Sequence, residues 1–128
     1  MTDNEITQNI IGAAIEVHKN LGPGLLESVY EICLYKELVS KGFTVKRQLG
    51  LPVIYKGEKC DLGFRIDLLV ENKVVIELKS VDALNDIHIA QLLTYLKLSE
   101  LNLGLLINFN VTKLVDGVKR VVNNFEEE

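Results

Sequence analysis

Two apolar segments near the middle of the chain, separated by a short polar stretch, most constrain how the chain can fold. Residues 61–70 and 73–79 are rich in Val, Ile and Leu, which predicts two neighbouring strands. A two-residue loop would mix charged and apolar side chains on both faces of the hairpin. A three-residue loop, Glu71-Asn72-Lys73, instead gives one wholly apolar face, with the pairs Val70–Val74, Leu68–Ile76 and Ile66–Leu78. Because a one-residue slip would turn the apolar set outward, we expect the three-residue loop.

This register places Asp67 directly opposite Glu77 on the second face of the hairpin. Two carboxylates directly opposite each other on neighbouring strands repel each other unless a cation lies between them. Carboxylate oxygens favour magnesium or manganese, and Lys79 follows Glu77 on the same strand face. The spacing therefore indicates a metal site, with a surface salt-bridge cluster of these residues and Arg65 as the alternative.

The remaining sequence predicts a mixed sheet flanked by helices, which is an α/β fold. Apolar spacing of about 3.6 residues predicts helices over residues 4–20, 25–40 and 85–100. Further strands are expected over residues 43–55 and 103–109. Asp116-Gly117 lies between the apolar segments 112–115 and 118–122, which predicts a C-terminal β-hairpin.

Length and charge limit the classes of protein to which the chain can belong. Its 128 residues are expected to form a single domain, with residues 124–128 as an acidic tail. No apolar run approaches the roughly 20 residues that span a bilayer, so we expect no membrane contact. The net charge of −4 argues against nucleic-acid binding by charge alone. An acidic N-terminus and two isolated cysteines, Cys33 and Cys60, predict a cytoplasmic location.

Three motifs in the chain resemble those of a known superfamily. Asp67 followed after nine residues by Glu77-Leu78-Lys79 resembles the core motif of the PD-(D/E)XK nucleases, with Ile66 in place of the proline. Gln91 to Tyr95 resembles the QxxxY element of the RecB-like branch. The segment from Gly24 to Tyr30 matches GxxExxY, the string that names a family of small proteins within this superfamily.

The resemblance implies a restriction-endonuclease-like fold and a metal-dependent nuclease. It implies that Glu27, Asp67, Glu77 and the carbonyl of Leu78 bind Mg²⁺ or Mn²⁺, and that Lys79 positions the attacking water. The catalytic residues would then be Asp67, Glu77 and Lys79. Phosphodiester hydrolysis needs a hydroxide at neutral pH and positive charge for the developing pentavalent phosphate, and a bound metal with an ammonium supplies both.

Four further residues are candidates for substrate binding. His88, Gln91 and Tyr95 share one face of a predicted helix, and Tyr30 lies one turn after Glu27. Alternatively, the three helical residues form a solvated polar stripe, and Tyr30 is a half-buried aromatic residue without a role in binding. The expected partner is nucleic acid, with DNA as the expected substrate. A homodimer is compatible with cutting both strands, which needs two active sites. The competing function is an inactive binding or assembly module with a nuclease fold.

Overall fold

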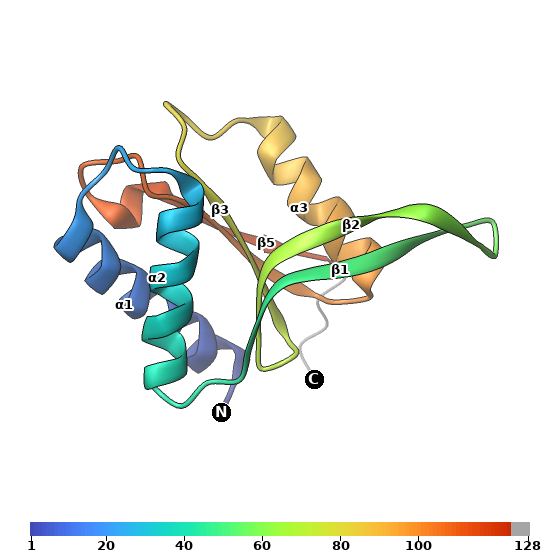
Figure 1. Ribbon diagram of the computed structural model, residues 1–128, viewed down its shortest axis with the longest axis horizontal. Coiled ribbons are helices and arrows are strands. Elements are labelled where there is room, and N and C mark those ends of the chain that lie inside the picture. The colour runs from blue at the N-terminus through green and yellow to red at the C-terminus, as the bar shows by residue number, and fades with distance from the viewer. Residues whose placement is uncertain (124–128) are drawn as a thin grey trace.

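The computed structural model describes residues 1–123, and the predicted acidic tail lies outside them (Figure 1). The described chain forms three α-helices, five strands and one short 3₁₀ turn. In chain order these are α1 (Asp3–Leu21), α2 (Glu27–Ser40), β1 (Val45–Tyr55), β2 (Glu58–Val70), β3 (Val74–Lys79), α3 (Asp86–Ser99), β4 (Leu103–Asn108), the 3₁₀ turn (Leu114–Gly117) and β5 (Val118–Val122). Each predicted helix is present, with both ends within two residues of those expected.

The five strands form one mixed sheet in the order β1-β2-β3-β4-β5. β3 and β4 are parallel and are joined by α3, whereas every other neighbouring pair is antiparallel. Helices α1 and α2 cover one face of this sheet and α3 covers the other (Figure 1). The architecture confirms the predicted α/β class with a mixed sheet flanked by helices.

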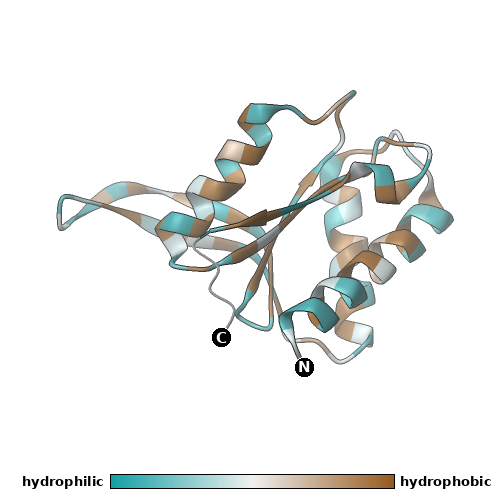
Figure 2. Cartoon of the chain, turned by 180° about the vertical axis from the view of Figure 1, so that it is seen from behind, coloured by the Kyte–Doolittle hydropathy of each residue, from teal (hydrophilic) through white to brown (hydrophobic). Residues whose placement is uncertain are grey.

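The two faces of the sheet bury separate apolar clusters. The larger cluster joins α1 and α2 to the sheet through residues such as Ile10, Leu34 and Ile76. The smaller cluster packs Leu92 and Leu96 of α3 against the opposite face. Hydrophobic residues accordingly gather on the central strands and on the helix sides turned toward them (Figure 2). Burial on both faces explains why β3 and β4 are nearly continuous apolar runs.

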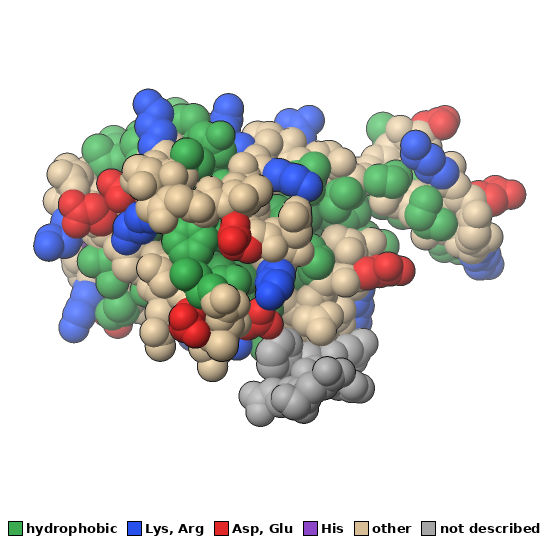
Figure 3. Space-filling model, turned by 90° about the horizontal axis from the view of Figure 1, so that it is seen from below, with side chains coloured by type: hydrophobic (Ala, Val, Ile, Leu, Met, Phe, Trp, Pro, Cys, Tyr) green, Lys and Arg blue, Asp and Glu red, His purple; other side chains and the backbone are tan. Residues whose placement is uncertain are grey.

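The outer halves of β1 and β2 extend beyond the body of the molecule as a hairpin arm (Figure 1). Several large apolar side chains of the arm are exposed: Ile54 by 53%, Tyr55 by 64% and Leu62 by 83%. In Figure 3 the arm is the separate lobe on the right, where hydrophobic surface alternates with charged side chains.

The C-terminal hairpin predicted from residues 112–115 and 118–122 is wrong in its first strand. Residues 112 and 113 form a bend, and Asp116-Gly117 lies within the 3₁₀ turn. β5 pairs instead with β4, with Ile107 opposite Val118, so the chain does end in an antiparallel pair. Gly117 explains the difference, because a Cβ there would lie 2.1 Å from the carbonyl oxygen of Asn108. The glycine permits this close backbone approach and does not form a two-residue turn.

The three-residue loop between β2 and β3 is confirmed, with Val70 opposite Val74 and Leu68 opposite Ile76. The predicted apolar pair of Ile66 and Leu78 is wrong. Leu78 belongs to the cluster beneath α1 and α2, whereas Ile66 belongs to the cluster beneath α3. The ladder ends at Leu68, because the next position is occupied by the two carboxylates described below.

None of the helices described in residues 1–123 is both long enough and apolar enough to span a membrane.

Candidate active site

Asp67 and Glu77 lie where β2 and β3 stop pairing through their backbones. The side chain of Glu77 accepts a hydrogen bond from the Asp67 amide at 2.8 Å, and the side chain of Asp67 accepts one from the Leu78 amide at 2.9 Å. Each carboxylate thus takes the place of a backbone carbonyl as the acceptor for an amide of the opposite strand. These two bonds hold the carboxylates side by side. The predicted juxtaposition of these two residues is therefore present, in a crossed arrangement in which side chains bind backbone amides.

Both carboxyl groups have raised pKa values. Burial, followed by the charge of Asp67, raises the pKa of Glu77 to about 8, against the lowering effects of the Asp67 amide and Lys79. Burial also raises the pKa of Asp67, together with the charges of Glu31 and Glu27. Without a bound cation, the site therefore retains a proton at neutral pH that a free carboxylate would have lost.

These pKa shifts predict an unusual dependence of stability on pH in metal-free protein. Between the unfolded value of 4.5 and the folded value of about 8, native Glu77 binds more protons than unfolded Glu77. Its contribution to stability is complete below the lower value and is lost as pH rises through the higher one. We expect the Glu77→Gln variant to gain thermal stability relative to wild type by roughly 10 °C as the pH increases from 5 to 8. Melting curves in EDTA measure this difference, and a difference that stays constant with pH would contradict the shift.

Glu27 and Lys79 lie at the same end of the sheet as the pair. Glu27 is the first residue of α2, and its exposed side chain accepts a hydrogen bond from the Ser80 amide at 3.3 Å. Lys79 is the last residue of β3 and is half-buried; its charge lowers the pKa of both Asp67 and Glu77. The structure thus gathers the four motif side chains, although the Glu27 carboxylate is turned toward Ser80.

Sequence reasoning missed a fifth charged residue, Glu31, which is only 5% exposed. Its carboxylate accepts a bond from Arg47 at 3.1 Å and another from the side chain of Gln48. Its charge raises the pKa of Asp67. Glu31 follows Glu27 by four residues, so the helical period alone was a signal that both carboxylates share one face of α2.

The three polar residues predicted on α3 have different surroundings. Tyr95 packs against Phe64 of β2 in a tilted arrangement, with ring centroids 4.9 Å apart. Burial raises the pKa of the Tyr95 hydroxyl, and the charges of Glu77 and Asp67 add to this effect. His88 accepts a bond from the Asn85 amide at 3.2 Å and so caps the N-terminus of α3. Gln91 is exposed between them. Of the three, Tyr95 is the one whose surroundings connect it to the carboxylate pair.

Tyr30 is fully buried, which does not fit the substrate-binding role expected for it. Its ring stacks on Phe109 at a centroid distance of 4.4 Å. Its hydroxyl donates to the carbonyl of Gly22 at 2.6 Å and accepts from the amide of Leu25 at 3.0 Å. Tyr30 thus stabilises the loop between α1 and α2, and so fixes the start of α2, where Glu27 lies.

We expect Tyr30→Phe to lower the free energy of unfolding by about 1–2 kcal/mol, because the Leu25 amide and Gly22 carbonyl lose their partner. Urea unfolding measures this loss. Tyr35→Phe is the matched control on the same helix, since the Tyr35 hydroxyl has no hydrogen bond among residues 1–123. Unchanged stability with weakened nucleic-acid binding would instead restore the substrate-binding role.

The donor set fits a hard divalent cation. Asp67 and Glu77 supply two adjacent carboxylates, each with one oxygen bound to an amide. Carboxylate and carbonyl oxygens are the ligands that Mg²⁺ and Mn²⁺ prefer. Among the described residues, no three His, Cys, Asp or Glu side chains already converge as metal ligands. Glu27 could supply a third carboxylate only by turning away from Ser80.

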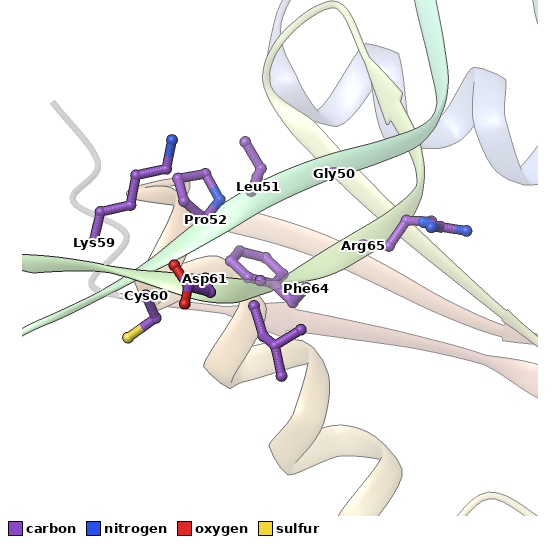
Figure 4. Close-up of a pocket in the computed structure, with 10 residues that line it drawn as sticks. Gly50, Leu51, Pro52, Lys59, Cys60, Asp61, Phe64 and Arg65 are labelled. Carbon is purple, nitrogen blue, oxygen red and sulfur yellow. The ribbon is translucent and has the colours of Figure 1, made fainter.

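A separate hollow of about 460 Å³ lies on the hairpin arm (Figure 4). Its lining includes Gly50, Pro52 and Gly63, with Lys59 toward the tip and Arg65 toward the body. Neither carboxylate of the pair lines it. The hollow is therefore distinct from the candidate active site.

The fold and its side chains define an α/β protein with a buried pair of carboxylates at the point where two strands diverge. A model of the PD-(D/E)XK nuclease superfamily matches residues 4–121, and the chain belongs to that superfamily. No curated protein matches the chain at a significant level. Among solved structures it is similar to one described as "Crystal structure of SSO0001", at 16% identity and a TM-score of 0.59. That match covers 94% of this chain and 79% of the other, and it supports the fold alone.

Proposed function

We propose that this protein is a metal-dependent nuclease that hydrolyses phosphodiester bonds of nucleic acid, with DNA as its substrate. The observation that carries the proposal is the buried pair of Asp67 and Glu77, crossed between two strands, with Lys79 beside it. Within the superfamily, the matches to GxxExxY and QxxxY favour the RecB-like branch. The two free cysteines favour the cytoplasm as its location.

In this proposal Asp67, Glu77 and the Leu78 carbonyl hold Mg²⁺ or Mn²⁺, with Glu27 as a further ligand. A metal held by these residues would lower the pKa of a water molecule and offset charge on the phosphate. Lys79 orients the attacking water and stabilises the negative charge that develops in the transition state. The amides of Asp67 and Leu78 keep the two carboxylates in place, so little reorganisation is needed when substrate binds.

Tyr95, Gln91 and His88 are proposed to contact substrate along α3. Tyr95 supports this most directly, because both carboxylates influence its hydroxyl. We also propose that two copies associate where both strands of a duplex are cut, since one chain carries one carboxylate pair.

A second function, an inactive binding or assembly module, is favoured by two observations. Glu27 is bound to the Ser80 amide, and residues 1–123 contain no ready group of three metal-ligating side chains. In this alternative the pair is a structural link between β2 and β3, and nucleic acid or protein binds without being cut.

The deciding experiment incubates purified protein with end-labelled single- and double-stranded DNA and RNA, in Mn²⁺, Mg²⁺ or EDTA. We expect cleavage of DNA with metal, none in EDTA, and none by an Asp67→Asn/Glu77→Gln double variant prepared in parallel. Equal cleavage by wild type and double variant would indicate a contaminating nuclease and contradict the proposal. Binding of these substrates without cleavage in any metal would support the module.

A further inference from the structure

At the active site, the side chains of β1 and β2 depart from the regular alternation between the two faces of the sheet. In a regular strand, residues two or four positions apart point to the same face of the sheet. On β2, however, Leu68 packs in the cluster beneath α1 and α2, whereas Ile66 packs beneath α3. On β1, Val45 and Leu49 are divided between the two clusters in the same way. The residues between them on the two strands therefore depart from the regular alternation.

The register locates this change at Gln48 and Asp67. Arg47 pairs with Leu68 and Leu49 pairs with Ile66, so Gln48 and Asp67 are the two positions left between these pairs. Gln48 has a φ of 54°, a left-handed conformation that a residue with a Cβ adopts at a cost. Contacts with the surrounding structure must therefore stabilise Gln48 in this conformation.

Glu31 of α2 makes the contact that stabilises this conformation of Gln48. Its buried carboxylate accepts hydrogen bonds from Arg47 and from the side chain of Gln48. Consecutive strand residues normally point to opposite faces, so one carboxylate can bind both only because Gln48 is left-handed. The contact with Glu31 and the change of face therefore occur together.

The change of face also sets the direction of the Asp67 side chain. Ile66 and Leu68, on either side of Asp67, point to opposite faces, and the carboxylate between them bonds to the Leu78 amide of β3. The Asp67 amide is likewise free of the ladder and donates to Glu77. Both bonds that hold the carboxylate pair depend on the backbone at this point.

We infer that Glu31 is a positioning residue, which acts through Gln48 to aim the Asp67 carboxylate at the β3 backbone and the proposed metal site. Glu31 itself need not touch metal or substrate for this role. The inference deepens the proposed function and rests on it wherever Mn²⁺ binding is measured. Its structural part concerns only residues of this chain and can be measured without metal.

Glycine at position 48 provides the discriminating variant, because it adopts the left-handed conformation without help from a partner. We expect Glu31→Ala to accelerate hydrogen exchange at the Asp67 and Leu78 amides by about tenfold or more. We also expect it to weaken Mn²⁺ binding by about tenfold, the lower end of the range for residues that orient ligands. In the Glu31→Ala/Gln48→Gly double variant, both properties should return to within about threefold of Gln48→Gly alone.

Glu31→Gln serves as the second variant, because it keeps an oxygen that accepts from Gln48 while removing the charge. It should leave the two amides protected as in wild type, and it also provides a folded protein if Glu31→Ala does not fold. Exchange is followed by NMR and Mn²⁺ binding by calorimetry. A double variant as impaired as Glu31→Ala would show that Glu31 does not act through Gln48, and a Glu31→Gln variant that loses protection would show that Glu31 acts through its charge. Either result would overturn the inference.

Failure of the proposed function gives a different result. A wild-type protein that neither binds Mn²⁺ nor cleaves nucleic acid would contradict the nuclease, while amide exchange in wild type and the four variants would still decide whether Glu31 positions Asp67.

Discussion

Replacing Lys79 by alanine should slow cleavage of nucleic acid by about 10²–10³-fold, the scale for losing one electrostatic contact to a transition state. Lys79 ends β3 beside Glu77, and its charge acts on both members of the carboxylate pair. Because the carboxylates remain, binding of Mn²⁺ and of substrate should change by much less than the rate. Single-turnover cleavage with enzyme in excess measures the rate, and calorimetry measures the metal affinity.

Lys73→Ala is the matched control for this variant. Lys73 directly precedes β3 at its other end, and its exposed ammonium lies 3.9 Å from Asp3. It should cleave at the wild-type rate. If Lys79→Ala cleaves as fast as Lys73→Ala, the role assigned to Lys79 is wrong, and a loss of stability without loss of rate would identify it as part of a salt-bridge cluster.

Replacing Asp67 by asparagine should remove most of the stabilisation that divalent metal gives to the fold. At a metal concentration about 100 times the Kd, binding to native protein adds about 2.7 kcal/mol, which raises the melting temperature by roughly 10 °C for a chain of this size. Asparagine keeps an oxygen to accept from the Leu78 amide but loses the charge that attracts the cation. The variant should therefore fold and respond to metal by no more than a few degrees.

The control for Asp67→Asn is Asp61→Asn, which changes an exposed carboxylate on the same strand, in the arm. It should respond to metal as wild type does. An equal rise in melting temperature for all three proteins would place the cation elsewhere on the molecule.

The helices and strands could be predicted because their apolar spacing is a local property of the sequence. Asp67 and Glu77 could be brought together from the sequence alone, because a short loop joins their strands and only one register buries the apolar set. The same reasoning failed at Ile66, where regular alternation was assumed but a left-handed residue on the neighbouring strand reverses it.

Glu31 and Tyr30 show what the sequence could not reveal. The contacts of Glu31 with Arg47 and Gln48 depend on how α2 packs against β1, and no local pattern determines that packing. Tyr30 was assigned to substrate from its place in a motif, yet its hydroxyl closes a loop eight residues upstream. Both residues are buried and act through contacts with other residues of the chain.

The most direct test is the position of a bound metal in crystals grown with Mn²⁺, located by its anomalous scattering. We predict a peak about 2 Å from one oxygen of Asp67 and one of Glu77, next to the carbonyl of Leu78. We also expect Glu27 to have turned from Ser80 toward the metal. A peak that lies only at other carboxylates, or a crossed pair that excludes Mn²⁺ at millimolar concentration, would contradict a metal-dependent active site at this point.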